Sequence, residues 1–116
     1  MEKKQFLGEF SLLDYNISHK VLLFRKSSNT EENQNIDLVF EGTFYLEVPT
    51  KLKNIIVYQA DEETTNKVIK RYGGMFYPEY SQVIFVIESG TALYYIGCIR
   101  LLITENSLNL LTSSIK

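Results

Sequence analysis

The side chains that most often carry out chemistry in proteins are scarce in this sequence. His19 is the only histidine and Cys98 the only cysteine, so the nitrogen and sulfur ligands of a zinc or iron site are missing. No Gly-x-Ser-x-Gly segment presents a serine, and Gly73-Gly74 lacks the lysine and spacing of a phosphate loop. His19 is suited to act as a general base, but at a strand start it is more simply a surface residue. We therefore predict a protein that is not an enzyme and has no metal or cofactor.

Carboxylates form two groups in the sequence. Asp61, Glu62 and Glu63 open a helical pattern, where acidic residues favour capping. The other group belongs to a predicted hairpin over residues 36–48, whose inner face would carry Leu38, Phe40, Phe44, Leu46 and Val48, and whose outer face would carry Asp37, Val39, Glu41, Thr43, Tyr45 and Glu47. The acidic outer face, defined by Asp37, Glu41, Tyr45 and Glu47, predicts a surface for a protein partner. The alternative is an ordinary solvated sheet face.

An aromatic loop over residues 73–80 is the second candidate for binding. Its aromatic and sulfur-containing side chains, with the residue before it, are Tyr72, Met75, Phe76, Tyr77 and Tyr80. Such side chains supply contact area at low entropic cost and are enriched at protein interfaces. The alternative is that they close the end of the β structure. We predict that Asp61 and Glu62, at the helix start, join this loop in contacting a partner.

Residues 82–104 predict the central hairpin, with a turn at residues 89–91. Both arms are apolar at odd and even positions alike, and so on both faces. In the first arm one face carries Val83, Phe85 and Ile87 and the other Ile84 and Val86. In the second arm one face carries Ile99, Leu101 and Ile103 and the other Ile96, Cys98 and Leu102. Strands that are apolar on both faces need cover on both faces. Further strands are predicted over residues 6–15, with a bulge or bend at its glycine, and over residues 19–26, 54–59 and 108–113.

One short helix is predicted over residues 61–72, with Asp61 as N-cap and Gly73 or Gly74 as its left-handed stop. Residues 27–35 contain no apolar side chain and predict an exposed loop. The fold class is mainly β: an antiparallel β-sandwich or half-closed barrel of about seven or eight strands with one α-helix.

Size and charge narrow the function classes. A chain of 116 residues predicts a single domain over residues 1–116. A formal charge of -2 offers no positive field for a phosphate backbone, which argues against nucleic acid as a partner. With one cysteine, no internal disulfide can form. The sequence contains no apolar run long enough to suggest a signal peptide or a membrane span. We therefore expect a cytoplasmic protein that contacts no membrane.

In its size, acidic balance and β-rich pattern, the chain resembles the small immunity proteins of bacterial contact-dependent or polymorphic toxin systems. The resemblance covers the whole chain loosely and implies a non-enzymatic module that neutralises a basic, nuclease-type toxin domain by covering its active site. The alternative hypothesis is a small-ligand-binding β domain or regulatory subunit, with Tyr58, Tyr94 and Tyr95 lining a pocket. An enzyme that uses His19 or buried carboxylates remains a third hypothesis.

Overall fold

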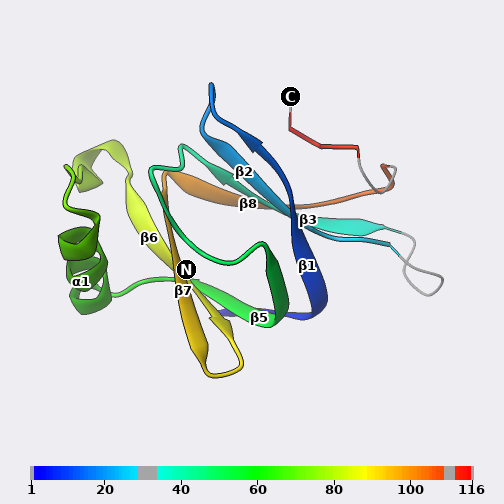
Figure 1. Cartoon of the computed structure of the whole chain (residues 1–116), viewed down its shortest axis with the longest axis horizontal. Helices are drawn as coiled ribbons and strands as arrows, with labels where there is room; N and C mark the ends of the chain where they lie inside the picture. The colour runs from blue at the N-terminus through cyan, green and yellow to red at the C-terminus, as the bar shows by residue number, and fades with distance from the viewer. Residues whose placement is uncertain (1, 29–33, 109–111, 116) are drawn as a thin grey trace.

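The computed structural model describes residues 2–28, 34–108 and 112–115. These residues form a long helix, a short 3-10 helix and a set of strands (Figure 1). In chain order the elements are β1 (Lys4–Asn16), β2 (Val21–Lys26), β3 (Asn35–Glu41), β4 (Tyr45–Glu47), β5 (Lys51–Gln59), α1 (Glu62–Tyr72), η1 (Pro78–Tyr80), β6 (Val83–Ser89), β7 (Ala92–Cys98) and β8 (Arg100–Asn106).

The strands form one antiparallel sheet of eight strands in the order β4-β7-β6-β5-β1-β2-β3-β8, which is not closed into a barrel. The prediction of a mainly β fold with one α-helix is confirmed. Strand β1 joins two parts of this sheet, because residues 4–11 pair with β5 and residues 11–16 pair with β2. We call β4, β7, β6 and β5 the helix half, and β2, β3 and β8 the tail half.

The hydrophobic core lies between the two halves. Phe40 of the tail half meets Phe85 of the helix half edge to face, with ring centroids 6.1 Å apart. The core draws on both halves and on β1, through Phe10, Leu22, Phe24, Leu38, Phe40, Leu52, Ile55, Val57, Phe85, Ile87, Ile96 and Cys98. One bent sheet therefore supplies both walls of a single core, as the two layers of a sandwich would.

Gly8 bends β1. Its φ of 102° lies in the region that favours glycine, and the β1–β5 register shifts between Phe6 and Glu9. The Gly8 N–H donates a hydrogen bond of 2.8 Å to Oδ1 of Asn54, so the amide released from the ladder finds another acceptor. The predicted bend at this glycine is confirmed.

The predicted hairpin over residues 36–48 is wrong. Strands β3 and β4 do not pair with each other: β3 pairs with β2 and β8, and β4 pairs with β7. Gly42, with φ 67°, turns the chain from one half of the sheet into the other instead of reversing it. The pattern misled because a glycine between two alternating runs is typical of a hairpin turn and equally of a corner.

A matching corner lies on the partner strand, where Ile99 separates β7 from β8. The Ile99 N–H donates to the Glu41 carbonyl at 2.8 Å and the Phe44 N–H to the Gly97 carbonyl at 2.8 Å, so hydrogen bonding continues on both sides of the bend. Ile99 itself is 45% exposed, and the core-facing residues change from even numbers in β7 to odd numbers in β8. The predicted second arm of the central hairpin is thus two strands with one residue between them.

The predicted faces of residues 43–47 are also wrong in part. Leu46 was expected in the core but is 41% exposed, because β4 is the last strand on its side of the sheet. Thr43 was expected on the outer face but is buried, and its hydroxyl donates to the Phe40 carbonyl at 3.0 Å.

The two apolar faces of β6 are both covered, as predicted. Phe85 and Ile87 face the core, and Ile84 and Val86 are buried on the other side, where α1 packs against β6. Figure 1 shows α1 beside this end of the sheet. The predicted helix is confirmed with its caps: Asp61 accepts a hydrogen bond of 2.8 Å from the Thr64 N–H, and Gly73 ends the helix at φ 70°. The two-residue turn at Gly90-Thr91 closes the β6–β7 hairpin.

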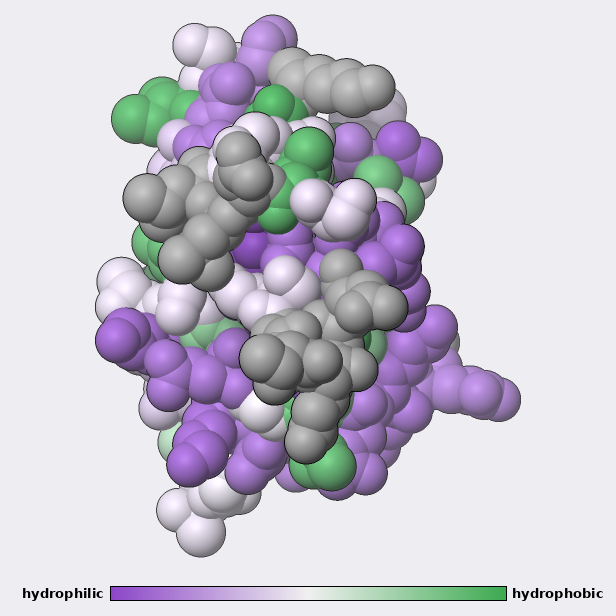
Figure 2. Space-filling view, turned by 90° about the vertical axis from the view of Figure 1, so that its right-hand side faces the viewer, coloured by the Kyte–Doolittle hydropathy of each residue, from purple (hydrophilic) through white to green (hydrophobic). Residues whose placement is uncertain are grey.

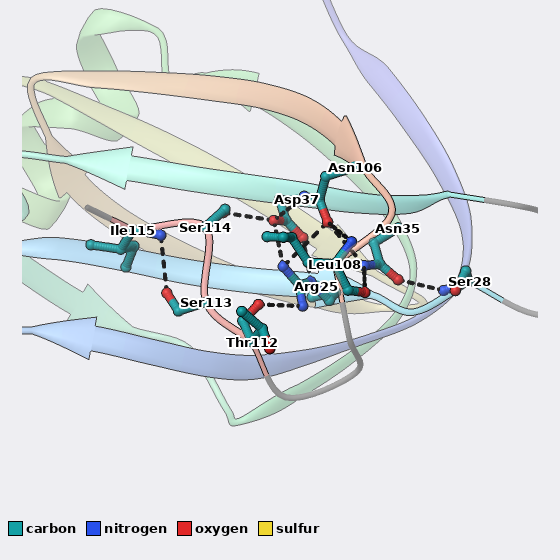
Figure 3. A network of polar contacts seen from close by, with 10 residues as sticks. All are labelled: Arg25, Ser28, Asn35, Asp37, Asn106, Leu108, Thr112, Ser113, Ser114 and Ile115. Carbon is teal, nitrogen blue, oxygen red and sulfur yellow. Dashed lines mark hydrogen bonds and ion pairs between the residues drawn. The ribbon is translucent and has the colours of Figure 1, made fainter.

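Asp37 is not on an exposed face. Its carboxylate is fully buried and receives two hydrogen bonds from Arg25, from Nε at 2.7 Å and from Nη2 at 2.9 Å (Figure 3). Asn106 and Ser114 each donate to Asp37 Oδ2 at 2.7 Å, and Arg25 donates to the Thr112 carbonyl at 2.8 Å. The pair lies away from the core face, and residues 112–115, which we call the C-terminal tail, cover it. Asp37 is therefore a structural residue in this fold.

Two other predictions need correction near the chain end and in the loop. Residues 107, 108 and 112–115 form no strand, and residues 109–111 of the predicted strand 108–113 lie outside the described part. Asn35, expected in an exposed loop, is fully buried; its amide donates to Asn106 Oδ1 and to the Leu108 carbonyl, both at 3.0 Å. Residues 29–33 of that loop also lie outside the described part.

The buried ion pair gives a stability prediction. Replacing Asp37 with Asn removes the buried negative charge that pairs with Arg25, so we expect the free energy of unfolding at pH 7 to fall by about 3–5 kcal/mol, measured by urea denaturation. Glu105→Gln, at an exposed position near the end of β8, is the control and should change the free energy by less than about 0.5 kcal/mol. A loss no larger than the control's would contradict the role given to the pair.

The same variant predicts a pH dependence. Burial alone would raise the pKa of Asp37, but hydrogen bonds from Arg25, Ser114 and Asn106, with the Arg25 charge, bring that pKa below its ordinary value of 3.8. Because the folded pKa is depressed, the stabilisation is complete above pH 3.8 and is lost as the pH falls through the folded value. The difference in stability between wild type and Asp37→Asn should therefore shrink in acid, and a difference that stays constant down to pH about 2 would contradict it.

Candidate functional site

The remaining acids of the predicted acidic outer face are paired within the chain. Glu41 forms an ion pair with Arg100, and Glu47 Oε2 accepts from Arg71 Nη2 at 2.8 Å. Glu47 Oε2 also accepts the Tyr45 hydroxyl at 2.6 Å. With Asp37 buried as well, this face offers little uncompensated negative charge to a partner.

The Glu47 contacts couple three ionisable groups. The hydrogen bond to Glu47, helped by partial burial, raises the pKa of the Tyr45 phenol above its ordinary value. Burial works to raise the pKa of Glu47, but the hydrogen bonds from Tyr45 and Arg71 lower it overall. Arg71 also lies over the Tyr95 ring, 5.2 Å from its centroid. The last turn of α1 is thus fastened to β4 and β7.

An aromatic cluster extends this contact between α1 and β4. Phe44 lies 5.4 Å from Tyr72 and 6.2 Å from Phe76 between ring centroids, and Tyr45 lies 5.7 Å from Tyr72. We call Phe44, Tyr45, Tyr72 and Phe76 the aromatic wall. The predicted aromatic loop is divided by this arrangement: Phe76 packs inward, whereas Met75 and Tyr80 are each 71% exposed.

One side of the aromatic wall forms a hollow of about 440 Å³, which we call the helix–loop hollow. It lies between the first turns of α1, the end of β5, the start of β6 and the aromatic loop. Its lining consists of Gln59, Ala60, Glu62, Thr65, Asn66, Phe76, Pro78, Gln82, Val83 and Ile84. Glu62 is the only charged residue in this lining, and within the described residues its carboxylate has no ion-pair partner.

Asp61, Glu63 and Gln82, near Glu62, each make a hydrogen bond or an ion pair within the chain. Asp61 caps the helix through the Thr64 N–H, which lowers the pKa of its carboxyl. Glu63 pairs with Lys67 one turn further on, at 3.5 Å. Gln82 Oε1 accepts the Tyr77 N–H at 2.7 Å, which fixes the end of the aromatic loop beside the hollow.

A second hollow of about 310 Å³, which we call the tyrosine hollow, lies on the other side of the wall. Its lining comes from the end of β1, the β1–β2 turn, the Gly42 corner with β4, and the end of α1. The lining residues are Tyr15, Lys20, Thr43, Phe44, Tyr45, Leu46 and Tyr72. Lys20 is its only charged residue, so the two hollows differ in the sign of their charge.

The structure thus distributes the predicted site residues over different places. Glu62 and Phe76 line the helix–loop hollow, and Tyr45 and Tyr72 line the tyrosine hollow. Tyr77 and Tyr80 contact each other, 5.7 Å apart between centroids, and Glu41 and Glu47 are ion-paired. Sequence reasoning missed Tyr15, Lys20 and Thr43, and also Gln59, Asn66 and Gln82. Nothing in their spacing along the chain could have found them, because the Gly42 corner brings the first three to the tyrosine hollow and the packing of α1 on β6 brings the other three to the helix–loop hollow.

The tyrosines of the alternative ligand pocket line neither of these hollows. The Tyr58 ring accepts the Lys3 ammonium 4.5 Å from its centroid, and burial with a hydrogen bond to Glu88 raises the pKa of Tyr58 to about 12. The Tyr95 ring makes a cation–π contact with Arg71, and Tyr94 packs against the core.

The remaining chemical candidates are placed as follows. Cys98 is buried, as its place in an apolar arm of the central hairpin predicts, and burial raises the pKa of its thiol to about 12. His19 is exposed, and its backbone N–H donates to Asn16 Oδ1 at 3.1 Å. Across residues 2–28, 34–108 and 112–115, no cluster of histidine, cysteine and acidic side chains is placed to hold a metal ion. No helix in the described part has both the length and the apolar character to cross a membrane.

The end of the molecule away from α1 faces the viewer in Figure 2. Figure 2 shows this side as mostly hydrophilic, with hydrophobic residues in scattered groups. Apolar residues in scattered groups are normal for a protein surface. Both hollows described above lie around α1 and the aromatic wall instead.

The Tyr45–Glu47 hydrogen bond can be tested by titration. Glu47→Gln removes the charge that opposes phenolate formation and keeps the Arg71 charge nearby, so we expect the pKa of Tyr45 to fall toward or below 10.0, measured by NMR of ¹³C-labelled tyrosine. Glu41→Gln, whose partner is Arg100, should leave it unchanged. If both variants leave the Tyr45 pKa where it is, the contact does not form in solution.

Comparison with known proteins adds no relative. No protein-family model matches the chain, and no curated protein or solved structure matches it at a significant level. The functional argument therefore depends on the geometry of the two hollows.

Proposed function

We propose that the chain is a non-enzymatic protein-binding module whose helix–loop hollow receives a basic side chain, lysine or arginine, from its partner. The observation that carries this proposal is the hollow of about 440 Å³ with Glu62 as its only charged lining residue and no ion-pair partner for Glu62 within the described residues. A cation entering the hollow would meet one unpaired carboxylate and no opposing charge from the lining.

The other lining residues suit the same guest. The side-chain oxygens of Gln59, Thr65 and Asn66 provide acceptors, and a guanidinium has five donors to satisfy. Phe76 offers a ring for cation–π contact, while Val83 and Ile84 match the aliphatic stem of a long basic side chain. The positive end of the α1 dipole opposes a cation here, but Asp61, Glu62 and Glu63 in and before the first turn offset it.

The hollow supports this role better than the acidic outer face does. On that face Asp37 is buried, and Glu41 and Glu47 would each have to leave an arginine before pairing with a partner. At the helix start Glu62 gives up no ion pair with any described residue on binding. Exposed Met75 and Tyr80, on the adjoining loop, supply apolar contact area of the kind that is enriched at interfaces.

The more specific form of the proposal is an immunity protein, whose partner is a basic toxin domain. An acidic hollow with exposed Met75 and Tyr80 beside it is compatible with covering a basic active site. In this form the captured partner has an activity of its own, and binding of the chain stops it.

The proposal is tested by affinity capture from the native cell lysate with the tagged chain. Wild type should recover one stoichiometric basic protein, and Glu62→Lys should reduce its recovery at least tenfold, because a like charge in the hollow repels the guest. With the partner purified, Phe76→Ala should weaken binding by about 1–2 kcal/mol in calorimetry.

Glu63→Lys is the matched control, since it makes the same charge change on the next helix residue, which does not line the hollow. It should leave recovery of the partner intact. Equal recovery with Glu62→Lys and Glu63→Lys would place the contact elsewhere, and recovery of no specific protein by wild type would reject a tight protein partner. A partner whose activity persists in the complex would reject the immunity form alone.

A further inference from the structure

We propose that the tyrosine hollow is a separate binding site for a small aromatic carboxylate. Its chemistry differs from that of the helix–loop hollow: one cation and several aromatic rings, with no acid in the lining. An ammonium group can pair with a carboxylate, and tyrosine and phenylalanine rings can cover a planar apolar body. The proposed ligand combines these two parts.

Lys20 supplies the cation. Its side chain is exposed at the rim and makes no ion pair within the part of the chain that the structure describes. Its backbone is held in place, because the Lys20 carbonyl accepts the Thr43 N–H at 2.8 Å. This contact, made with Lys20 at φ 55°, ties the β1–β2 turn to the Gly42 corner and holds the Lys20 backbone beside the hollow.

The rings supply a preformed wall. Phe44 and Tyr72 support each other and are backed by Phe76, so little side-chain freedom is lost when a ligand binds against them. Tyr15 and Leu46, which line the same hollow, are 39% and 41% exposed. A ligand ring that covers them would remove apolar surface from water, which favours binding. Tyr15 and Tyr72 hydroxyls make no hydrogen bond to the described residues and remain open to a ligand.

Charge and size narrow the ligand further. Glu47, which is hydrogen-bonded to Tyr45, is already paired with Arg71, so it opposes an incoming carboxylate only weakly. A volume of about 310 Å³ lies at the lower end of the range for small-molecule pockets, which suits a ligand with one ring. Benzoate is the simplest molecule with the required parts, and benzamide has the same shape without the charge.

The experiment is a titration of ¹⁵N-labelled full-length chain with benzoate and, separately, with benzamide, followed by NMR. We expect benzoate to shift the signals of the lining residues of the tyrosine hollow, with a dissociation constant on the order of 1 mM. Benzamide should bind at the same place roughly fivefold more weakly, because it lacks the ion pair with Lys20. This comparison uses the wild-type chain and depends on no variant.

Lys20→Met should lower the affinity for benzoate to that for benzamide and leave benzamide binding unchanged. Lys51→Met, at an exposed position at the start of β5, is the matched control and should change neither. Glu62→Lys should also leave benzoate binding intact, which separates this site from the protein-binding surface. Equal affinities for the two probes, shifts confined to other residues, or no shift at about ten times the expected dissociation constant would each overturn the proposal.

Discussion

The fold depends on one constraint: a single sheet has to cover both sides of its own core. The chain meets it with two adjacent corners, one at Gly42 between β3 and β4 and one at Ile99 between β7 and β8. Backbone hydrogen bonds of 2.8 Å on either side of the bend keep the ladder nearly continuous, so the turn from one half to the other leaves few backbone groups without partners. A Cβ at Gly42 would lie 2.6 Å from the Ile99 side chain, which shows how tightly the two corners fit.

Both hollows are consequences of these corners and of the helix that packs beside them. The Gly42 corner brings Phe44 and Tyr45 to the last turn of α1, where Tyr72 and Arg71 hold them. The resulting aromatic wall separates a hollow whose charge is that of Glu62 from one whose charge is that of Lys20. A shift of Phe44 would alter both hollows, since its ring touches Tyr72, which lines one, and Phe76, which lines the other.

Local patterns in the sequence predicted the elements well and their neighbours poorly. The α1 caps, the β6–β7 turn and the bend at Gly8 depend on residues close together in the chain, and all of them are confirmed. The β3–β4 hairpin failed because Gly42 permits a corner as readily as a turn, and only the pairing with β7 and β8 decides between them. Asp37 was misplaced for a related reason: alternation put it on the outer face correctly, but the tail that buries this face is distant in sequence. For the site, Glu62 and Phe76 were found by type, whereas Lys20 and Tyr15 reach the tyrosine hollow only through the fold.

The contacts around the C-terminal tail bear on the order of folding during synthesis. Arg25, on β2, donates to the Thr112 carbonyl, which follows it by 87 positions, so this hydrogen bond forms only when residue 112 is present. Strand β3 likewise gains its second neighbour only when β8 is present. The β6–β7 hairpin and α1 use nearby partners and are able to form while the chain is still growing. The tail half closes only after β8 and residues 112–115 have left the ribosome, and until then its β3 edge and the Arg25 and Asp37 charges stay open to water. Emergence of the C-terminal tail is therefore the step that completes this half of the sheet.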